Sequence, residues 1–520
     1  MDQDISLLNT AIGPVMRGPS SSHSAAPYMI GRTIRELSLG PDEQLMGVNI
    51  YFDPAGSFAQ VYQNQGSDQG FAAGLCGLAL MSPEYAEVLK QLETTGLPRF
   101  EISLQTLELN EHPNRVDLKV EIADAKGNIR CDTYAAVSTG GGVFSVDKLN
   151  QHRLRLKGKC VSILIEHHGL DDAELLASLA NKAKVIDIYH EENLVQIDLE
   201  GALPHPVFDK IQSSPSVDRV RQTQPRQYAS INEEVLYSSL DKILHDVKDE
   251  DHLADLALSY EVRRLQQSHS QVRNYFIQRL DIMLSSVDEG LNKQTKSMRF
   301  LPASAQSFAQ AELPSAMQSG FMKNAIAGAL AVMEVSSSRG VVCAAPTAGS
   351  AGIVPGCLYA LKQEGANQDE LVQVLMVISL VGALFAARGS FAAETGGCSV
   401  ETGASAAMAA AGIVHYYQGS AQQAFDAAAM CLMNTLGLVC DPVGGEVEIP
   451  CHARNIAGVS HAWSASIAIL GGFSAVIPFD ELVDKTQAIG KQMSSDLRCT
   501  AKGGCATTPC AQQMVSKTPN

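Results

Sequence analysis

The sequence has no block of lysines and arginines and no basic stretch interleaved with aromatic residues, although its formal net charge is -17 at pH 7. Only 18% of its 520 residues are charged and 6% are aromatic, whereas 45% are hydrophobic. This balance is typical of a globular enzyme with a large core, long enough for several domains. The acidic charge argues against nucleic acid or an anionic membrane as a partner and leaves small metabolites.

The N-terminus lacks the basic start and long apolar stretch of a signal or transit peptide, so we expect a cytoplasmic protein. Two apolar stretches invite comparison with membrane helices. Residues 374–387 are too short to span a bilayer, and residues 462–479 contain serines and end in proline. We expect both stretches to form buried helices.

No CxxC pair occurs, although the chain contains 12 cysteines. In a cytoplasmic chain cysteines are more often free thiols or metal ligands than disulfides. All of them except Cys76, Cys131 and Cys160 lie at or after Cys343. We therefore expect cysteine chemistry in the C-terminal third.

Residues 1–152 mix runs of strand-like and helix-like periodicity, which predicts an α+β domain. The predicted elements are strands at 46–52, 101–109 and 115–123, a helix at 70–93 and a glycine turn at 138–144.

Residues 157–224 alternate in the order βαββαβ, which is typical of a ferredoxin-like or ACT-like module. Such modules bind amino acids or serve as dimerisation and spacer units, and both roles stay open here. The predicted strands are 160–166, 185–191, 194–200 and 217–223, and the predicted helices are 171–184 and 205–214.

Residues 231–520 are helix-forming, first with charged faces and then, from about residue 315, rich in alanine, glycine and serine. Small residues let helices approach closely, so we expect an all-α domain with a dense core. The predicted fold is thus multidomain: an N-terminal α+β domain, a central ACT-like module and a C-terminal all-α domain that carries the cysteine site.

Three cysteines lie in turns bounded by glycine or proline: Cys398 in GGCSVETG, Cys440 in GLVCDPVGG and Cys451 in EIPCHARN. Thiolates in turns, near free backbone N–H groups, suit a metal or an iron–sulfur cluster. Their spacing matches no zinc ribbon, which makes zinc the weaker prediction. Three thiolates on a four-iron cluster leave one iron open as a Lewis acid. Buried structural cysteines would explain the same pattern.

The stretch RGPSSSHSAAP, residues 17–27, gathers four serines around His23. Hydroxyl and N–H groups of such a turn can bind a carboxylate, and histidine can act as a base near neutral pH. From these residues alone a helix N-cap is the more common role for the serines, and a structural hydrogen bond would explain the histidine.

Together, RGPSSSHSAAP, APTAGSAGIVPG, GGCSVETGASAAMAAAG and GLVCDPVGGEVEIPCHARN resemble the iron–sulfur L-serine dehydratases (L-serine ammonia-lyases), in the same order and over most of the chain. The resemblance implies a β part and an α part fused in one chain, with the ACT-like module between them. It also implies a homodimer and a [4Fe-4S] cluster on Cys398, Cys440 and Cys451, whose unligated iron binds the hydroxyl of L-serine. The products would be pyruvate and ammonia.

The resemblance also assigns roles to individual residues. Catalysis would fall to His23, Ser67 and Asp68, and substrate binding to Ser20, Ser21, Ser22, Ser24, Asn114, Gly141 and Arg454. Some relatives place a C-terminal cysteine in the active site, and Cys510 or Cys505 would take that place here.

One departure concerns the base. Where family members carry histidine-glycine-threonine-aspartate, this chain has Gln65, Gly66, Ser67 and Asp68. His23 would then have to act as the base, and the substrate could be another β-hydroxy or β-thiol amino acid, acted on by a dehydratase or a desulfidase.

Other functions remain open at this point. The glycine loop 345–356 could cradle an anion, as in pyridoxal-phosphate enzymes, but no lysine has a supporting motif for a Schiff base. An amino-acid sensor working through the ACT-like module, with a degenerate lyase site, is a second function. A hydrolase with a thiolate-bound metal is a third.

Overall fold

The computed structural model describes residues 5–107, 112, 114–169, 179, 182–228, 237–247, 252–292, 298–317 and 320–518. The chain divides into two compact units, Ser22–Ile231 and a helical unit made of Met1–Ser21 with Asn232–Asn520. Residues 1–21 therefore group with the helices and not with the α+β domain expected over 1–152. The reason is a pairing between distant segments: β1 (Val15–Arg17) is antiparallel to β12 (Val341–Cys343).

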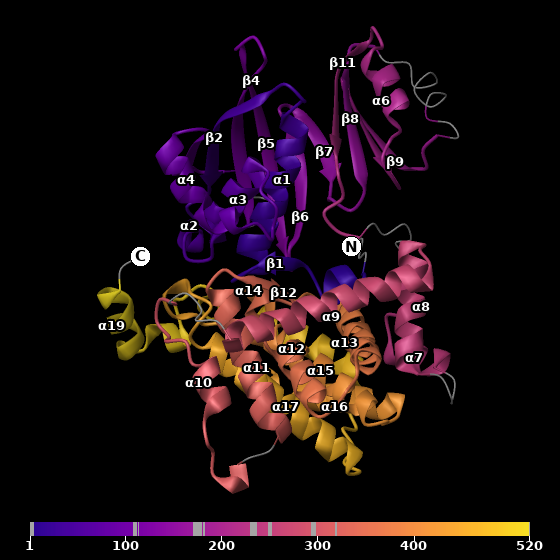
Figure 1. Ribbon diagram of the computed structural model, residues 1–520, viewed down its shortest axis with the longest axis vertical. Coiled ribbons are helices and arrows are strands. Elements are labelled where there is room, and N and C mark those ends of the chain that lie inside the picture. Colours follow the sequence, from indigo (N-terminus) through magenta and orange to yellow (C-terminus); the bar gives the residue numbers. More distant parts are fainter. Residues whose placement is uncertain are drawn as a thin grey trace. The chain divides into compact units, whose positions relative to one another are not determined.

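The unit Ser22–Ile231 contains a six-stranded sheet in the order β3-β2-β4-β5-β6-β7 (Figure 1). Only the β2–β3 pair is parallel, and the other neighbours are antiparallel. The strands predicted at 46–52 and 115–123 are confirmed, and the strand predicted at 101–109 ends at Leu104. The strands are β2 (Gln44–Phe52), β3 (Arg99–Leu104), β4 (Arg115–Ala123), β5 (Ile129–Gly140), β6 (Val143–Leu149) and β7 (His152–Leu156).

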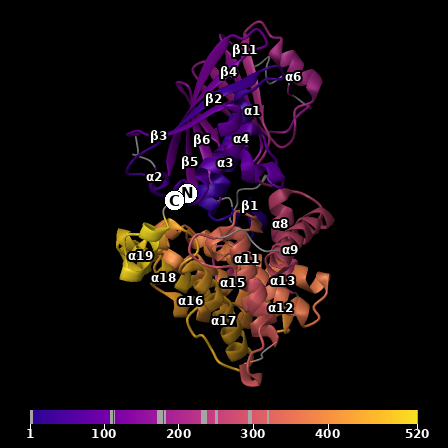
Figure 2. The same ribbon diagram turned by 60° about the vertical axis from the view of Figure 1, so that its left-hand side comes forward.

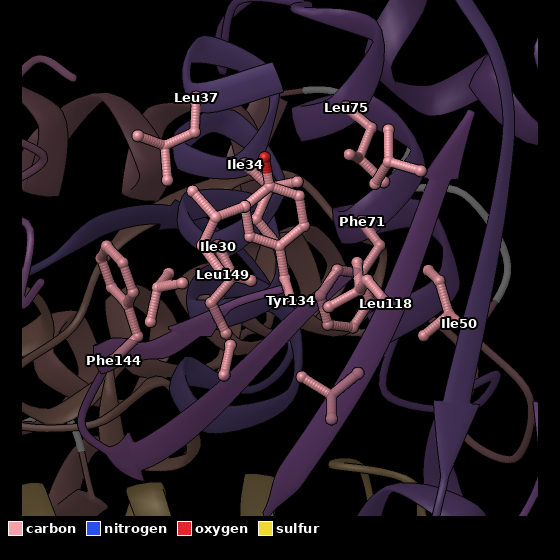
Figure 3. Packing of buried hydrophobic residues seen from close by; sticks show 14 of the residues in the cluster. Ile30, Ile34, Leu37, Ile50, Phe71, Leu75, Leu118, Tyr134, Phe144 and Leu149 are labelled. Atoms are coloured by element: carbon pink, nitrogen blue, oxygen red, sulfur yellow. The ribbon is translucent and has the colours of Figure 1, made fainter. Parts of the chain in front are cut away.

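One face of this sheet is buried under α1 (Ala26–Ser38) and α3 (Ser67–Cys76). Alternate residues of β4 are buried, as expected for a strand with one face against a core. Figure 3 shows Ile30 of α1 and Phe71 of α3 meeting Leu118 and Tyr134 of the strands. This packing fixes the position of the segment that precedes α1.

The helix predicted over 70–93 is broken. α3 ends at Cys76 because Gly77 takes the left-handed conformation (φ +77°) and its N–H turns back to the carbonyls of Ala73 and Gly74. A short 3-10 turn, Pro83–Glu87, and α4 (Val88–Thr95) follow.

The same unit holds a second, four-stranded antiparallel sheet in the order β11-β8-β10-β9. All four predicted strands and the helix predicted at 205–214 are present within two residues of their expected ends. The helix predicted at 171–184 lies largely outside the described residues. The elements are β8 (Val161–His167), β9 (Val185–Glu191), β10 (Leu194–Leu199), α6 (His205–Gln212) and β11 (Val217–Thr223).

The two sheets share a core. Leu164 and Leu194 of the four-stranded sheet belong to the same hydrophobic cluster as Leu154 and Leu156 of β7. The opposite face of β8, with Ile163, packs in a separate cluster around α6. Residues 157–224 are therefore not packed independently of the six-stranded sheet.

The described residues of the other unit are mainly helical, as predicted. α15 lies inside, in contact with α12, α13, α16 and α17 (Figure 1 and Figure 2). The helices are α7 (Leu240–Asp246), α8 (Leu253–Leu265), α9 (His269–Asn292), α10 (Ala305–Gln310), α11 (Gly320–Ser337), α12 (Ile353–Gln363), α13 (Gln368–Arg388), α14 (Ala393–Gly396), α15 (Thr402–Tyr416), α16 (Ala421–Thr435), α17 (Cys451–Leu470), α18 (Phe479–Gln492) and α19 (Pro509–Lys517).

Small residues set the helix spacing. A Cβ on Gly290 of α9 would lie 2.4 Å from the carbonyl oxygen of Ala331 in α11, which shows that the two backbones touch. α13 is long and apolar enough to cross a membrane, but 83% of its most apolar window is buried inside the structure, as expected for a core helix. The expectation for 462–479 is only half right, because α17 ends at Leu470 and Val476 lies exposed in the following loop.

Candidate functional site

Cys398 lies in a short 3-10 turn between α14 and α15. The preceding Gly397 has φ +67°, and a Cβ there would lie 2.5 Å from the carbonyl oxygen of Leu438, so only glycine fits. The backbone N–H of Ser399 donates to that same oxygen (3.2 Å). These contacts hold the turn of Cys398 against the loop that leads to Cys440.

The side-chain donor atoms of Cys398, Cys440 and Glu401 all lie within 4.8 Å of one another. The Cys398 thiol is 3.9 Å from Glu401 Oε2, and the two cysteines are only 2% and 4% exposed. Two buried thiols and a half-buried carboxylate are donors suited to a metal. The structure thus joins two of the three predicted cysteine ligands and adds Glu401, whose only sequence signal was its place in GGCSVETG.

Cys451 is buried at the first position of α17, where backbone N–H groups have no partner within the helix. One turn later, Asn455 Nδ2 donates to the carbonyl oxygens of Cys451 (2.9 Å) and Gly349 (2.8 Å). Its Oδ1 accepts the N–H of Gly352 (3.0 Å). This single amide ties the start of α17 to the predicted glycine loop.

Arg454 connects Cys398 to Asp441. Its Nη1 donates to Cys398 Sγ (3.2 Å), and its Nη2 donates to Asp441 Oδ1 (2.6 Å). Asp441 Oδ2 also accepts the backbone N–H of Cys505 (2.6 Å). Because a cation beside a thiol favours the thiolate, Arg454 supplies charge to the cysteine site.

The neighbouring thiols differ in how readily they lose a proton. The hydrogen bond from Cys440, helped by Arg454, lowers the pKa of the Cys398 thiol to about 7 against the effect of burial. The pKa of the Cys440 thiol is raised, because it donates to Cys398 and is buried. Burial and the negative charges of Cys398 and Glu401 raise the pKa of the Cys451 thiol. Cys398 is therefore the first of the three to ionise.

Cys499 lies beside Cys440, a neighbour that the sequence analysis did not predict. The Cys440 N–H donates to the carbonyl oxygen of Leu497 (2.8 Å), and the Cys499 N–H donates to that of Cys440 (2.7 Å). Cys499 also packs against the buried Cys440 side chain. The predicted tail ligands Cys505 and Cys510 are exposed instead.

These residues fit the iron–sulfur cluster that the resemblance implies. Cys398, Cys440 and Cys451 are buried, come from three separate segments, and have an arginine beside one thiol to offset negative charge. A pocket of about 340 Å³ borders the site, with Thr402, Arg454 and His461 in its lining. It is large enough for a small metabolite.

In the unit Ser22–Ile231, His23 lies in the π-helical turn that precedes α1 and is 2% exposed. Its Nδ1 is 2.8 Å from Ser22 Oγ and its Nε2 is 3.0 Å from Ser57 Oγ. Ser57 donates to Asn114 Oδ1. The structure thus connects the predicted site residues Ser22, His23 and Asn114 through Ser57. Ser57 is the first residue of α2 (Ser57–Val61), and the sequence analysis did not predict its role.

The serines of this segment do not cap α1. Its N-cap position is held by Ala25, without a side-chain hydrogen bond.

Ser67 is fully buried at the start of α3, and its hydroxyl has no hydrogen-bond partner among the described residues. Buried hydroxyls are rarely left unpaired, so this group points to a ligand or a water. Asp68 accepts the N–H of Gln69 (2.7 Å). Gln65, which stands where a histidine was expected, is buried and accepts the Ser24 hydroxyl at its carbonyl oxygen (2.5 Å).

Ser20, Ser21 and Gly141 have different surroundings. The chain passes from one unit to the other between Ser21 and Ser22, so Ser20 and Ser21 belong with the helices. Gly141 takes φ +60° in the turn between β5 and β6, and a Cβ there would meet no atom within 4 Å. The turn conformation by itself accounts for this glycine.

Comparison with known proteins identifies relatives of the helical unit. The family model described as the serine dehydratase alpha chain matches residues 243–506. The probable L-serine dehydratase alpha chain of Bacillus subtilis is 34% identical over 268 residues, which are 51% of this chain and 89% of that relative. The L-serine dehydratase alpha chain of Peptoniphilus asaccharolyticus is 32% identical over 263 residues, 50% of this chain and 90% of the relative.

A further relative, the L-serine dehydratase of Streptomyces coelicolor, is 31% identical over 259 residues, 48% of this chain and 56% of its own length. The family match spans half of the chain and contains the turns of Cys398, Cys440 and Cys451 together with Arg454. The chain therefore belongs to the serine dehydratase alpha chain family.

Proposed function

We propose that this protein is an iron–sulfur L-serine ammonia-lyase, which converts L-serine into pyruvate and ammonia. The observation that carries the proposal is the convergence of the buried Cys398 and Cys440 thiols in a chain of the serine dehydratase alpha chain family. The relative from Peptoniphilus asaccharolyticus is named L-serine dehydratase, alpha chain.

We assign Cys398, Cys440 and Cys451 as ligands of a [4Fe-4S] cluster. When bound, a cluster with three protein ligands supplies an open iron as a Lewis acid for the β-hydroxyl, which is otherwise a poor leaving group. Arg454 holds Cys398 in its thiolate form and keeps its own position through Asp441.

The substrate side of the proposal rests on the serine–histidine segment. The hydroxyls of Ser20, Ser21, Ser22 and Ser24, with Asn114 and Gly141, would bind the substrate, and His23 would take the α-proton. Ser67 and Asp68 would orient the amino acid. The unpaired buried hydroxyl of Ser67 and the two serine hydroxyls bonded to His23 support these roles.

Gln65 keeps the substrate class open within this chemistry. A buried amide lacks the titratable group expected at this position, so a related β-hydroxy or β-thiol amino acid is the alternative substrate. Release of keto acid from L-serine, L-threonine, D-serine and L-cysteine, assayed in parallel, would identify the preferred one.

Anaerobic purification tests the main proposal. We expect a brown protein with iron and sulfide that releases pyruvate and ammonia from L-serine. Cys398→Ser, Cys440→Ser and Cys451→Ser should each lose iron, whereas Cys357→Ser, which alters a buried thiol in α12, should keep it. A colourless wild type with one zinc, and activity restored by zinc, would favour the hydrolase function instead.

We also infer that residues 157–224 form an ACT-like module, which the strand order β11-β8-β10-β9 supports. An amino-acid sensor with a degenerate lyase site is the alternative function. Deleting the module would expose Leu154 and Leu156, so a deletion does not separate the two functions. Equilibrium dialysis with labelled amino acids does, because a sensor would bind its amino acid without turnover.

The proposal includes a cytoplasmic homodimer with no nucleic-acid or membrane partner. The acidic charge and the buried position of α13 support it. Analytical ultracentrifugation of the anaerobic protein gives the oligomeric state, and a monomer would exclude the dimer.

A further inference from the structure

His23 is the second member of a chain of four polar side chains drawn from three separate segments. Ser22 meets Nδ1 at 2.8 Å, Ser57 meets Nε2 at 3.0 Å, and Ser57 donates to Asn114 Oδ1. Ser22, His23 and Asn114 are all buried. Water is therefore largely shut out around these three side chains, and Ser57 is half-buried between His23 and Asn114.

The protons available in this chain decide which ring nitrogen of neutral His23 carries the hydrogen. A serine hydroxyl has one proton, and Ser57 gives it to Asn114 Oδ1. The Ser57 oxygen can then only accept from His23, so Nε2 carries the hydrogen. In a neutral imidazole the other nitrogen, Nδ1, is the acceptor, and it receives the hydroxyl of Ser22.

The start of α2 is built to hold this arrangement. Asp53, just before it, is buried and accepts the N–H groups of Ala55 (2.7 Å) and Leu107 (2.7 Å), which fixes the turn from β2 into α2. Phe58, next to Ser57, packs against the ring of His23 at a centroid distance of 5.0 Å and an angle of 62°. Two successive residues thus orient the imidazole: Ser57 bonds to its Nε2, and Phe58 packs against its ring.

We propose that Ser57, with Asn114 Oδ1 as the acceptor of its hydroxyl, is a positioning residue that holds His23 in its Nε2–H form, so that His23 takes up a proton only at Nδ1, the nitrogen that faces Ser22. This assignment rests on the proposed role of His23 as the base. It makes Ser22 the hydroxyl through which a proton reaches the imidazole. Ser57 is then needed for the tautomer and not for contact with the substrate.

Nitrogen-15 NMR of histidine-labelled holoenzyme, with His23 identified from the His23→Gln spectrum, tests the tautomer without substrate. We expect the Nε2–H form in the wild type and in Ser57→Thr, which keeps the hydroxyl. Asn114→Asp should also keep it, because either carboxylate oxygen accepts. Asn114→Leu should shift His23 toward the Nδ1–H form, since Ser57 can then donate to Nε2.

Turnover gives a second readout. Ser57→Ala should lower kcat by about 10–100-fold with little change in KM. This is the range seen when a histidine in a site loses the group that is hydrogen-bonded to its second nitrogen. Ser57→Thr should restore kcat. Ser38→Ala is the matched control, because it removes a buried hydroxyl bonded to Tyr134 (2.8 Å) in the same unit and should change neither readout.

A wild-type spectrum with the Nδ1–H form, or a Ser57→Ala spectrum like the wild type, would overturn the proposal. A correct tautomer in a protein that does not act on L-serine would instead reject the proposed function and leave the tautomer assignment standing.

Discussion

Arg454 and Asp441 form an ion pair buried beside the cysteine site, and breaking it should be costly. The two side chains are 12% and 3% exposed, and Nη2 lies 2.6 Å from Oδ1. Arg454→Met fills a similar volume but leaves the Asp441 carboxylate without its cation. Loss of one partner of a buried pair destabilises a protein by about 3–5 kcal/mol. We expect the low end of this range, because the N–H of Cys505 still donates to Asp441.

The fluorescence of the one tryptophan in the sequence can be used to measure this change in stability. Trp463 lies on α17, the helix that carries Arg454, and stacks on Phe321 at a centroid distance of 3.9 Å. Urea unfolding followed by its fluorescence, on iron-free protein under reducing conditions, therefore reports on the helical unit. Adding Asp441→Asn should recover part of the loss, since the unpaired charge is then removed.

Arg388→Met provides the control. Arg388 also pairs with an aspartate, Asp484, and lies 3.9 Å from a second, Asp480, but its side chain and that of Asp484 are 25% and 47% exposed. A pair so accessible to water contributes at most about 1 kcal/mol. Equal losses in Arg454→Met and Arg388→Met, or no coupling between Arg454 and Asp441 in the double-mutant cycle, would refute the reasoning.

Two further predictions concern the helical unit. Burial raises the pKa of Glu261 from its usual 4.5 to about 7, so the folded chain keeps a proton that the unfolded chain releases. The stability that this group contributes therefore falls by roughly 3 kcal/mol as pH rises from 4.5 to 7. Urea unfolding at pH 5 and 8 should show this loss in the wild type and not in Glu261→Gln. Parallel pH profiles of the two proteins would contradict the prediction. Gly290→Ala should lower the free energy of unfolding by about 1–3 kcal/mol, because the new Cβ meets the backbone of Ala331. Gly320→Ala, which has open space around it, should be neutral or stabilising. Similar denaturation midpoints for the two variants would argue against the contact.

Most strands could be predicted because their signal is local. β4 alternates buried and partly exposed residues over its whole length, and a sequence shows such a period of two without knowledge of the partner strand. The prediction of one helix over 70–93 was wrong for the opposite reason. The apolar run continues through Gly77, whose left-handed conformation is decided by how the end of α3 packs and not by the run itself.

The candidate site was predictable in part. Cys398, Cys440 and Cys451 stand close to glycines or a proline that interrupt helices, and such positions are visible in the sequence. Glu401 and Cys499 were not selected, because nothing local distinguishes a carboxylate or a thiol that will face Cys398 or Cys440 from one that faces solvent.

The sequence by itself determined the spans of β2, β4 and β8 to β11, the helical character and close packing of the alanine-rich part, and the glycine and proline positions beside the three cysteines, because each depends on residues near one another along the chain. Only the tertiary structure decided which distant groups meet. Glu261 accepts the N–H of Leu7 (2.8 Å) and so anchors the first residues to the helical unit. Ser57 joins His23 to Asn114 in the same way, across segments that no local pattern connects. Such contacts depend on the packing of the whole unit, which no short stretch of sequence specifies.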